Sequence, residues 1–188
     1  MKASDARTSP KRWFRLGLAT LVVPVAVLIP TMAYAGAGQD DLADVRQVTA
    51  RFHSVEAAMD AGYELGYVNG AGQRIITGCI AHPTAGAMGY HYFNKELIED
   101  LVADVSKPEG LVYAPTSDGN LRLVSVEYVV PSAGSNPPGV SEPPSVLGME
   151  MHILVPPPGP AFYILHAWVW GHNPAGMFVD WNPEVSCP

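Results

Sequence analysis

The feature that most constrains the fold is a pair of apolar runs on either side of the sequence TSDGN. The first run is GLVYAP, residues 110–115, and the second is LRLVSVEYVV, residues 121–130. An Asp-Gly step between two runs rich in β-branched residues is typical of a β-hairpin. The pattern predicts two antiparallel strands whose side chains alternate between the two faces of a sheet.

Other short apolar segments predict further strands around this hairpin. They lie at residues 74–80, 87–93, 146–155 and 162–170. Loops rich in proline, glycine and serine separate several of them, and the longest loop covers residues 131–144. Strands joined by hairpins and loops favour a largely antiparallel sheet of about five to seven strands.

Helical patterns occur mainly before the strands. Apolar residues recur at steps of three and four from residue 40 to about 63, and Ser54 is a good N-cap for a short second helix. Asn94 is a good N-cap for another helix that would run to about residue 105. The predicted fold class is therefore α+β, with a helix or helix pair on the sheet. A small curved β cup or barrel is the alternative.

The N-terminus has the anatomy of a secretory signal peptide. Five basic residues precede an uncharged apolar run at residues 16–32, and the sequence AYA at residues 33–35 is a small-x-small cleavage site. We therefore expect residues 1–35 to be removed and residues 36–188 to form one exported globular domain. This predicts a secreted or extracytoplasmic protein that keeps no stable membrane anchor after cleavage.

The charge of the chain limits the partners that we expect. The formal net charge is −7, and five of the eleven Lys and Arg residues lie within the predicted leader. The exported part is therefore more acidic than the whole chain and has no basic patch for a phosphate backbone. We expect no nucleic-acid partner, and instead an unknown small ligand or an ion.

The two cysteines, Cys79 and Cys187, are predicted to form a disulfide. Cysteine pairs in exported proteins form disulfides in an oxidising compartment, and the sequence contains no CxxC motif that would suggest a metal or redox site. Because Cys187 is the penultimate residue, the bridge would fasten the C-terminal tail to the segment that carries Cys79.

Several histidines and carboxylates fall on apolar faces of predicted strands. The stretch GCIAHPTAGAMGYHYFN, residues 78–94, holds two histidines, and alternation places Glu127 with Val129 and His166 with Trp168. Buried polar groups need partners, and a shared metal ion would satisfy several of them at once. The predicted metal-ligand set is His82, His91, His152, His166, Glu127 and Glu150.

Imidazole and carboxylate ligands suit one transition metal ion, namely zinc, copper, iron or manganese. Tyr90 and Tyr92 flank His91 and could supply hydrogen bonds to the site, and Met151 offers a soft ligand that would favour copper. No HExxH motif or nucleophile elbow is present, so neither catalytic residues nor an enzymatic activity follow from the sequence. A polar pocket without a metal is the alternative.

The C-terminal tail suggests a different class of function. Trp168, Trp170 and Trp181 could form an exposed aromatic platform for a flat ligand. The protein would then be a metal-free extracellular binding or structural module.

Five segments together resemble a group of small secreted bacterial proteins of unassigned function. They are GCIAHPTAGAMGYHYFN, LVYAP, VEYVV, GMEMHI and NPAGMFVDWNPEVSC, and the resemblance that they mark extends over most of the exported part. The resemblance implies export and a single domain, and it transfers no catalytic or binding residue.

Overall fold

The fold is seen in a computed structural model, which describes residues 37–155 and 161–188. The predicted signal peptide lies outside the described residues. The described residues form three α-helices and one 3-10 helix, with bounds α1 Ala37–Thr49, η1 Ala50–His53, α2 Val55–Asp60 and α3 Lys95–Glu99. No helix in these two ranges is long and apolar enough to cross a membrane.

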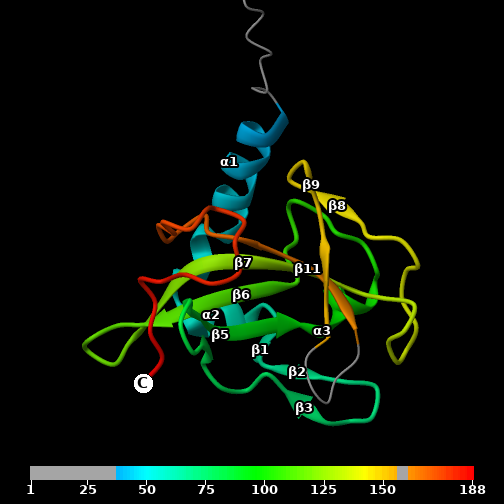
Figure 1. Ribbon diagram of the computed structural model, residues 1–188, viewed down its shortest axis with the longest axis horizontal. Helices are drawn as coiled ribbons and strands as arrows, with labels where there is room; N and C mark the ends of the chain where they lie inside the picture. The colour runs from blue at the N-terminus through cyan, green and yellow to red at the C-terminus, as the bar shows by residue number, and fades with distance from the viewer. Residues whose placement is uncertain (1–36, 156–160) are drawn as a thin grey trace, which may run out of the picture. The chain divides into compact units, whose positions relative to one another are not determined.

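Eleven short and long strands accompany the helices in the described ranges. Their bounds are β1 Tyr63–Leu65, β2 Tyr67–Val68, β3 Arg74–Ile75, β4 Ile80–His82, β5 Gly86–Asn94, β6 Gly110–Pro115, β7 Leu121–Pro131, β8 Ser145–Val146, β9 Met149–Glu150, β10 His152–Leu154 and β11 Phe162–Ala167. Seven of them form one antiparallel sheet in the order β1-β5-β6-β7-β11-β10, with β4 paired to β5 (Figure 1). The α+β prediction is confirmed, and the sheet does not close into a barrel.

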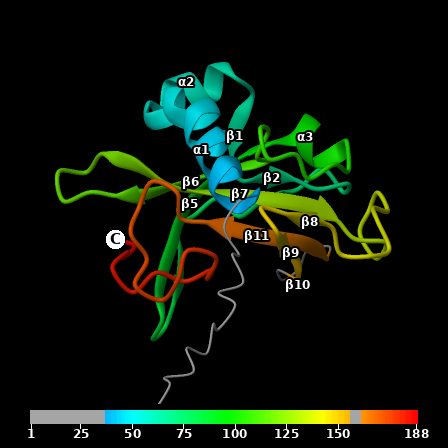
Figure 2. The same ribbon diagram turned by 90° about the horizontal axis from the view of Figure 1, so that it is seen from above.

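The two faces of the sheet have different coverings. The N-terminal helices pack on one face, where Val45, Phe52 and Ala58 join the largest hydrophobic cluster. We call this the helical face. Much of the C-terminal segment, residues 168–188, lies over the opposite face, which we call the site face (Figure 2), although Val169 and Trp170 pack on the helical face. Two smaller apolar clusters lie on the site face, one around Phe93 and Val129 and the other around Val112 and Trp168.

Side-chain caps explain where two of the helices begin, and a backbone conformation explains where the second of them ends. The Ser54 side chain accepts a hydrogen bond from Ala57 N, and Asn94 accepts from Glu96 N and Leu97 N, so both predicted N-caps are confirmed. The predicted helix to about residue 105 is too long. It stops at Glu99, because Leu101 adopts a left-handed conformation, with a φ of 63°, that is typical of a residue just past a helix end.

Two predicted strands are interrupted where the backbone enters the left-handed region. Ile76, with φ 58°, separates β3 from β4, which were expected as one strand over residues 74–80. Leu147 and Gly148, with φ 55° and 72°, form a tight turn between β8 and β9. Two successive positive φ values define the type I′ hairpin turn, so the expected strand over residues 146–155 is instead a small hairpin followed by β10.

The predicted disulfide between Cys79 and Cys187 is confirmed. It fastens the C-terminal segment to the residues just before β4, and backbone hydrogen bonds of 3.1 Å in both directions join Asn182 to Ala87 on β5. These contacts hold the end of the C-terminal segment against the site face, although the segment has little regular structure.

Glu109, just before β6, carries an unusual carboxyl group. Its side chain is buried, and Oε2 accepts a hydrogen bond from Val129 N at 3.0 Å. Burial raises the pKa of Glu109 to about 9, and the nearby carboxyls of Asp100 and Glu127 act in the same direction. Glu109 is therefore protonated at neutral pH in the folded protein.

We expect Glu109→Gln to raise the free energy of unfolding by up to about 3 kcal/mol at pH 7. The folded protein keeps the Glu109 proton up to about pH 9, whereas the unfolded chain loses it near the ordinary value of 4.5. Stability of the wild type should thus fall as pH rises through this window, and the amide removes that fall. Urea denaturation of the metal-free proteins at pH 5, 7 and 9 measures it.

The exposed Glu142→Gln provides the matched control, and its stability should follow the wild type at each pH. If the Glu109→Gln and wild-type stabilities changed in parallel from pH 5 to 9, the carboxyl would not be protonated in the folded state.

Candidate metal centre

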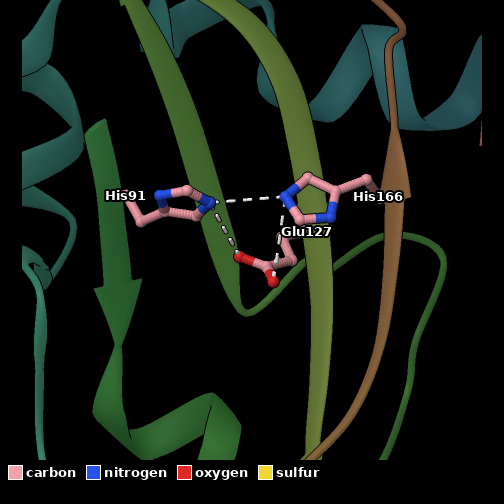
Figure 3. A group of neighbouring side chains, drawn as sticks. All are labelled: His91, Glu127 and His166. Atoms are coloured by element: carbon pink, nitrogen blue, oxygen red, sulfur yellow. Dashed lines mark hydrogen bonds and ion pairs between the residues drawn. The ribbon is translucent and has the colours of Figure 1, made fainter. Parts of the chain in front are cut away.

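Three buried side chains from three strands meet on the site face. His91 lies on β5, Glu127 on β7 and His166 on β11, and one ligand atom of each lies within 4.8 Å of the others (Figure 3). Glu127 and His166 are direct partners in the β7–β11 register. The two histidine rings approach from opposite sides, with the carboxylate between them (Figure 3).

Gly110 allows side chains to meet across the intervening strand β6. It is paired with Phe93 on one side and with Glu127 on the other. A Cβ atom at Gly110 would lie 3.0 Å from both the Glu127 Cβ and the Phe93 ring, closer than side chains normally pack. Because glycine lacks that atom, residues of β5 and β7 close over β6, and His91 Nε2 comes within 3.5 Å of Glu127 Oε2.

We expect Gly110→Ala to destabilise the protein by about 1–3 kcal/mol, because the new methyl group overpacks the contact between Glu127 and Phe93. Thermal or urea unfolding measures the change. Gly78→Ala is the matched control, since a Cβ atom there meets nothing within 4 Å. Equal stabilities of the two variants would show that Gly110 is not needed to admit the cluster.

The spacing of the nitrogen atoms fits two ligands of one ion. His91 Nε2 and His166 Nε2 are 3.3 Å apart. Two imidazole nitrogens at about 2.0–2.1 Å from a tetrahedral zinc ion are separated by roughly 3.3–3.4 Å. Glu127 Oε2 lies 3.5 Å from His91 Nε2, and Glu127 Oε1 lies 3.9 Å from His166 Nε2. The carboxylate is therefore close to the position that an ion between the two nitrogens would occupy.

The cluster is buried with few hydrogen bonds of its own. The side chains of His91, Glu127 and His166 are at most 4% exposed. Within the cluster, His91 Nδ1 and Glu127 Oε2 have no hydrogen-bond partner, whereas His166 Nδ1 and Asp180 Oδ1 face each other as an ion pair at 3.4 Å. Leaving a buried carboxylate oxygen unpaired is costly, so Glu127 Oε2 beside the two Nε2 atoms favours a bound cation at this place.

The surroundings of the cluster keep His91 neutral and make the proton of the Glu127 carboxyl easy for a metal ion to displace. Burial and, to a lesser degree, neighbouring His166 lower the pKa of His91 to about 3. Burial raises the pKa of Glu127 to about 7, although His166 opposes this. Burial also lowers the pKa of His166, but Glu127 and Asp180 outweigh this effect and raise it overall. A neutral His91 is ready to donate a lone pair.

Asp180 extends the cluster toward the surface. It lies in the C-terminal segment, with Oδ1 3.4 Å from His166 Nδ1 and Oδ2 3.0 Å from Nε2 of the half-exposed His152. Burial raises the pKa of Asp180, but the two histidines more than offset this and lower it. A carboxylate at Nδ1 favours the His166 tautomer whose Nε2 is free for a metal.

We expect Asp180→Ala to weaken metal binding by about 10–100-fold, the usual effect of losing a carboxylate that orients a histidine ligand. Competition titration with a chelating dye measures the affinity. Glu184→Ala is the matched control, because Glu184 lies in the same segment and contacts His172, both of them exposed. Unchanged affinity in Asp180→Ala would mean that Asp180 does not orient His166.

The structure places the other predicted ligands apart from this cluster. His152 touches it only through Asp180. His82 is exposed, where its Nδ1 accepts hydrogen bonds from the backbone of Thr84 and Ala85. Glu150 is exposed on β9, in the hairpin with β8.

The predicted ligand-contact residues lie mostly in the hydrophobic core. Tyr90, Tyr92 and Met151 pack in or against the core of the helical face, on the other side of the sheet from the cluster. Trp168 is buried, and its Nε1 donates to Val179 O. Trp170 donates to Thr49 Oγ1. Among the described residues, the exposed large apolar side chains include no aromatic one, so an aromatic platform is not present there.

No family model matches the chain, and neither the curated proteins nor the solved structures that were compared with it give a match. The assignment of the site therefore rests on its geometry and chemistry.

Proposed function

We propose that this protein binds one transition metal ion through His91 Nε2, His166 Nε2 and the Glu127 carboxylate. The observation that carries the proposal is the 3.3 Å separation of the two Nε2 atoms beside a buried carboxylate. Hydrogen bonding alone accounts less well for the cluster. One Nε2–H could donate to the other ring, but Glu127 Oε2 would still have no partner.

The donor set favours zinc or iron(II). Two histidines and one carboxylate form the protein ligands of many catalytic zinc sites and of non-haem iron(II) sites, which keep further positions open. Copper has less support than the sequence suggested, because Met151 packs on the helical face, away from the cluster. The positive charge of a divalent ion would be balanced by two carboxylates, namely Glu127, which binds the ion, and Asp180, which contacts its ligand His166.

Elemental analysis of the untagged protein, purified without added metal, tests this function. We expect close to one zinc or iron ion per chain. Glu127→Gln should lose the metal, whereas Glu150→Gln, the other acid predicted from the sequence, should keep it. A folded wild-type protein that contains no metal, and takes up none from zinc or iron(II) solutions, would refute the proposal.

We also propose that the protein acts outside the cytoplasm. The Cys79–Cys187 disulfide supports this, because such bonds persist in oxidising compartments. Mass spectrometry of the protein recovered from its native host tests the proposal. A mature chain that begins at Gly36 and carries the disulfide is expected, and a reduced chain that begins at Met1 would contradict it.

A further inference from the structure

A small cavity on the site face adjoins the cluster. It has a volume of about 20 Å³, room for roughly one or two molecules the size of water. Its lining residues are Tyr67, Ile76, Phe93, Ile98, Glu127, Val129, Leu154, Phe162 and Ile164. Glu127 belongs to both the cavity and the candidate metal centre.

The cavity occupies the next row of side chains along the strands. Phe93 follows His91 by two residues, Val129 follows Glu127 by two, and Ile164 precedes His166 by two. Strand β5 runs parallel to β7, since both are antiparallel to β6, and β11 runs the opposite way to β7. All three steps therefore lead in one direction along the sheet, from the metal ligands into the cavity.

The side chains that line the cavity restrict the class of molecule that it could bind. Glu127 is the one charged group in it, and the other side chains are apolar apart from the hydroxyl of Tyr67. A stable buried water needs two to four polar partners, which this wall does not offer. An anion would meet the Glu127 carboxylate and lose its hydration. A small neutral molecule with little hydrogen-bonding capacity fits best.

We propose that an open coordination position of the metal faces this cavity and takes a neutral diatomic molecule of the dioxygen, nitric oxide and carbon monoxide class. The inference rests on the proposed metal binding, and it adds the class of external ligand and the side from which it reaches the ion. Val129 and Ile164 would then set how much space that ligand has.

Nitric oxide binding to the iron(II)-loaded protein, followed anaerobically by electron paramagnetic resonance, tests the inference. Val129→Ile adds one methyl group to the cavity wall and should weaken binding by at least about tenfold through steric exclusion. Val179→Ile makes the same change at an exposed position in the C-terminal segment and should bind like the wild type. Ile164→Val enlarges the cavity and should bind at least as tightly as the wild type.

The iron content of each protein is measured in the same samples, which separates the two proposals. A wild-type protein that holds iron but binds no nitric oxide would overturn the inference and leave the metal site standing. Equal binding by Val129→Ile and wild type at equal iron content would also overturn it. A folded wild type that takes up no iron or zinc would refute the metal site and the inference together.

Discussion

Replacing either histidine of the cluster should lower the affinity for zinc or iron(II) by more than about 100-fold, a larger loss than is usual for residues that only orient a ligand. Each substitution, His91→Ala or His166→Ala, removes one of two nitrogen ligands that lie 3.3 Å apart. The remaining histidine and carboxylate would hold the ion too weakly for a stable complex. Competition titration against a chelator of known affinity measures the loss.

His82→Ala is the control for this experiment. His82 was also predicted as a ligand, but it is exposed and its ring packs near Trp181, away from the cluster. Its loss should leave the affinity unchanged. Circular dichroism must show that all three variants remain folded. Wild-type affinity in a folded His166→Ala protein would contradict the assignment of this ligand.

Removing the disulfide should have the largest effect on stability. The bond closes a loop of 108 residues, for which the chain-entropy model gives about 4–5 kcal/mol. The double variant Cys79→Ser/Cys187→Ser should therefore unfold at a much lower urea concentration. Metal affinity should fall as well, because the C-terminal segment carries Asp180, which contacts His166.

Two comparisons separate the disulfide from a simple effect of the substitutions. A reductant should lower the stability of the wild type toward that of the double variant, and it should leave the double variant unchanged. The backbone hydrogen bonds between Asn182 and Ala87 remain available, so the variant should retain the fold of the sheet. Equal stability of the oxidised wild type and the double variant would contradict the expected role of the bond.

The sequence allows the fold class to be predicted because local signals agree with the final topology. The Asp-Gly turn at residues 118–119 joins β6 to β7, and Ser54 and Asn94 cap helices as their side-chain chemistry predicts. The failures occur where single residues take left-handed conformations that their type does not favour. Ile76, Leu101 and Leu147 have positive φ values that tertiary packing imposes and that propensity does not reveal.

The candidate site is only partly predictable for a related reason. Alternation along single strands indicates that His91, Glu127 and His166 point where apolar residues point. It does not give the order of strands or their register, so it cannot separate these three from His82, His152 and Glu150. Gly110 acts through the strand between the ligands. Asp180 lies in an irregular segment where no periodicity exists. The local sequence around Gly110 and around Asp180 therefore does not indicate that either residue belongs to the site.

Anomalous X-ray diffraction from crystals of the zinc-loaded or iron-loaded protein tests the central claim most directly. We predict one anomalous peak at near-full occupancy, about 2 Å from His91 Nε2, His166 Nε2 and a Glu127 oxygen. The absence of a peak at that position in well-ordered crystals, or a principal peak at His82 or His152 instead, would contradict the claim that these three residues form a metal centre.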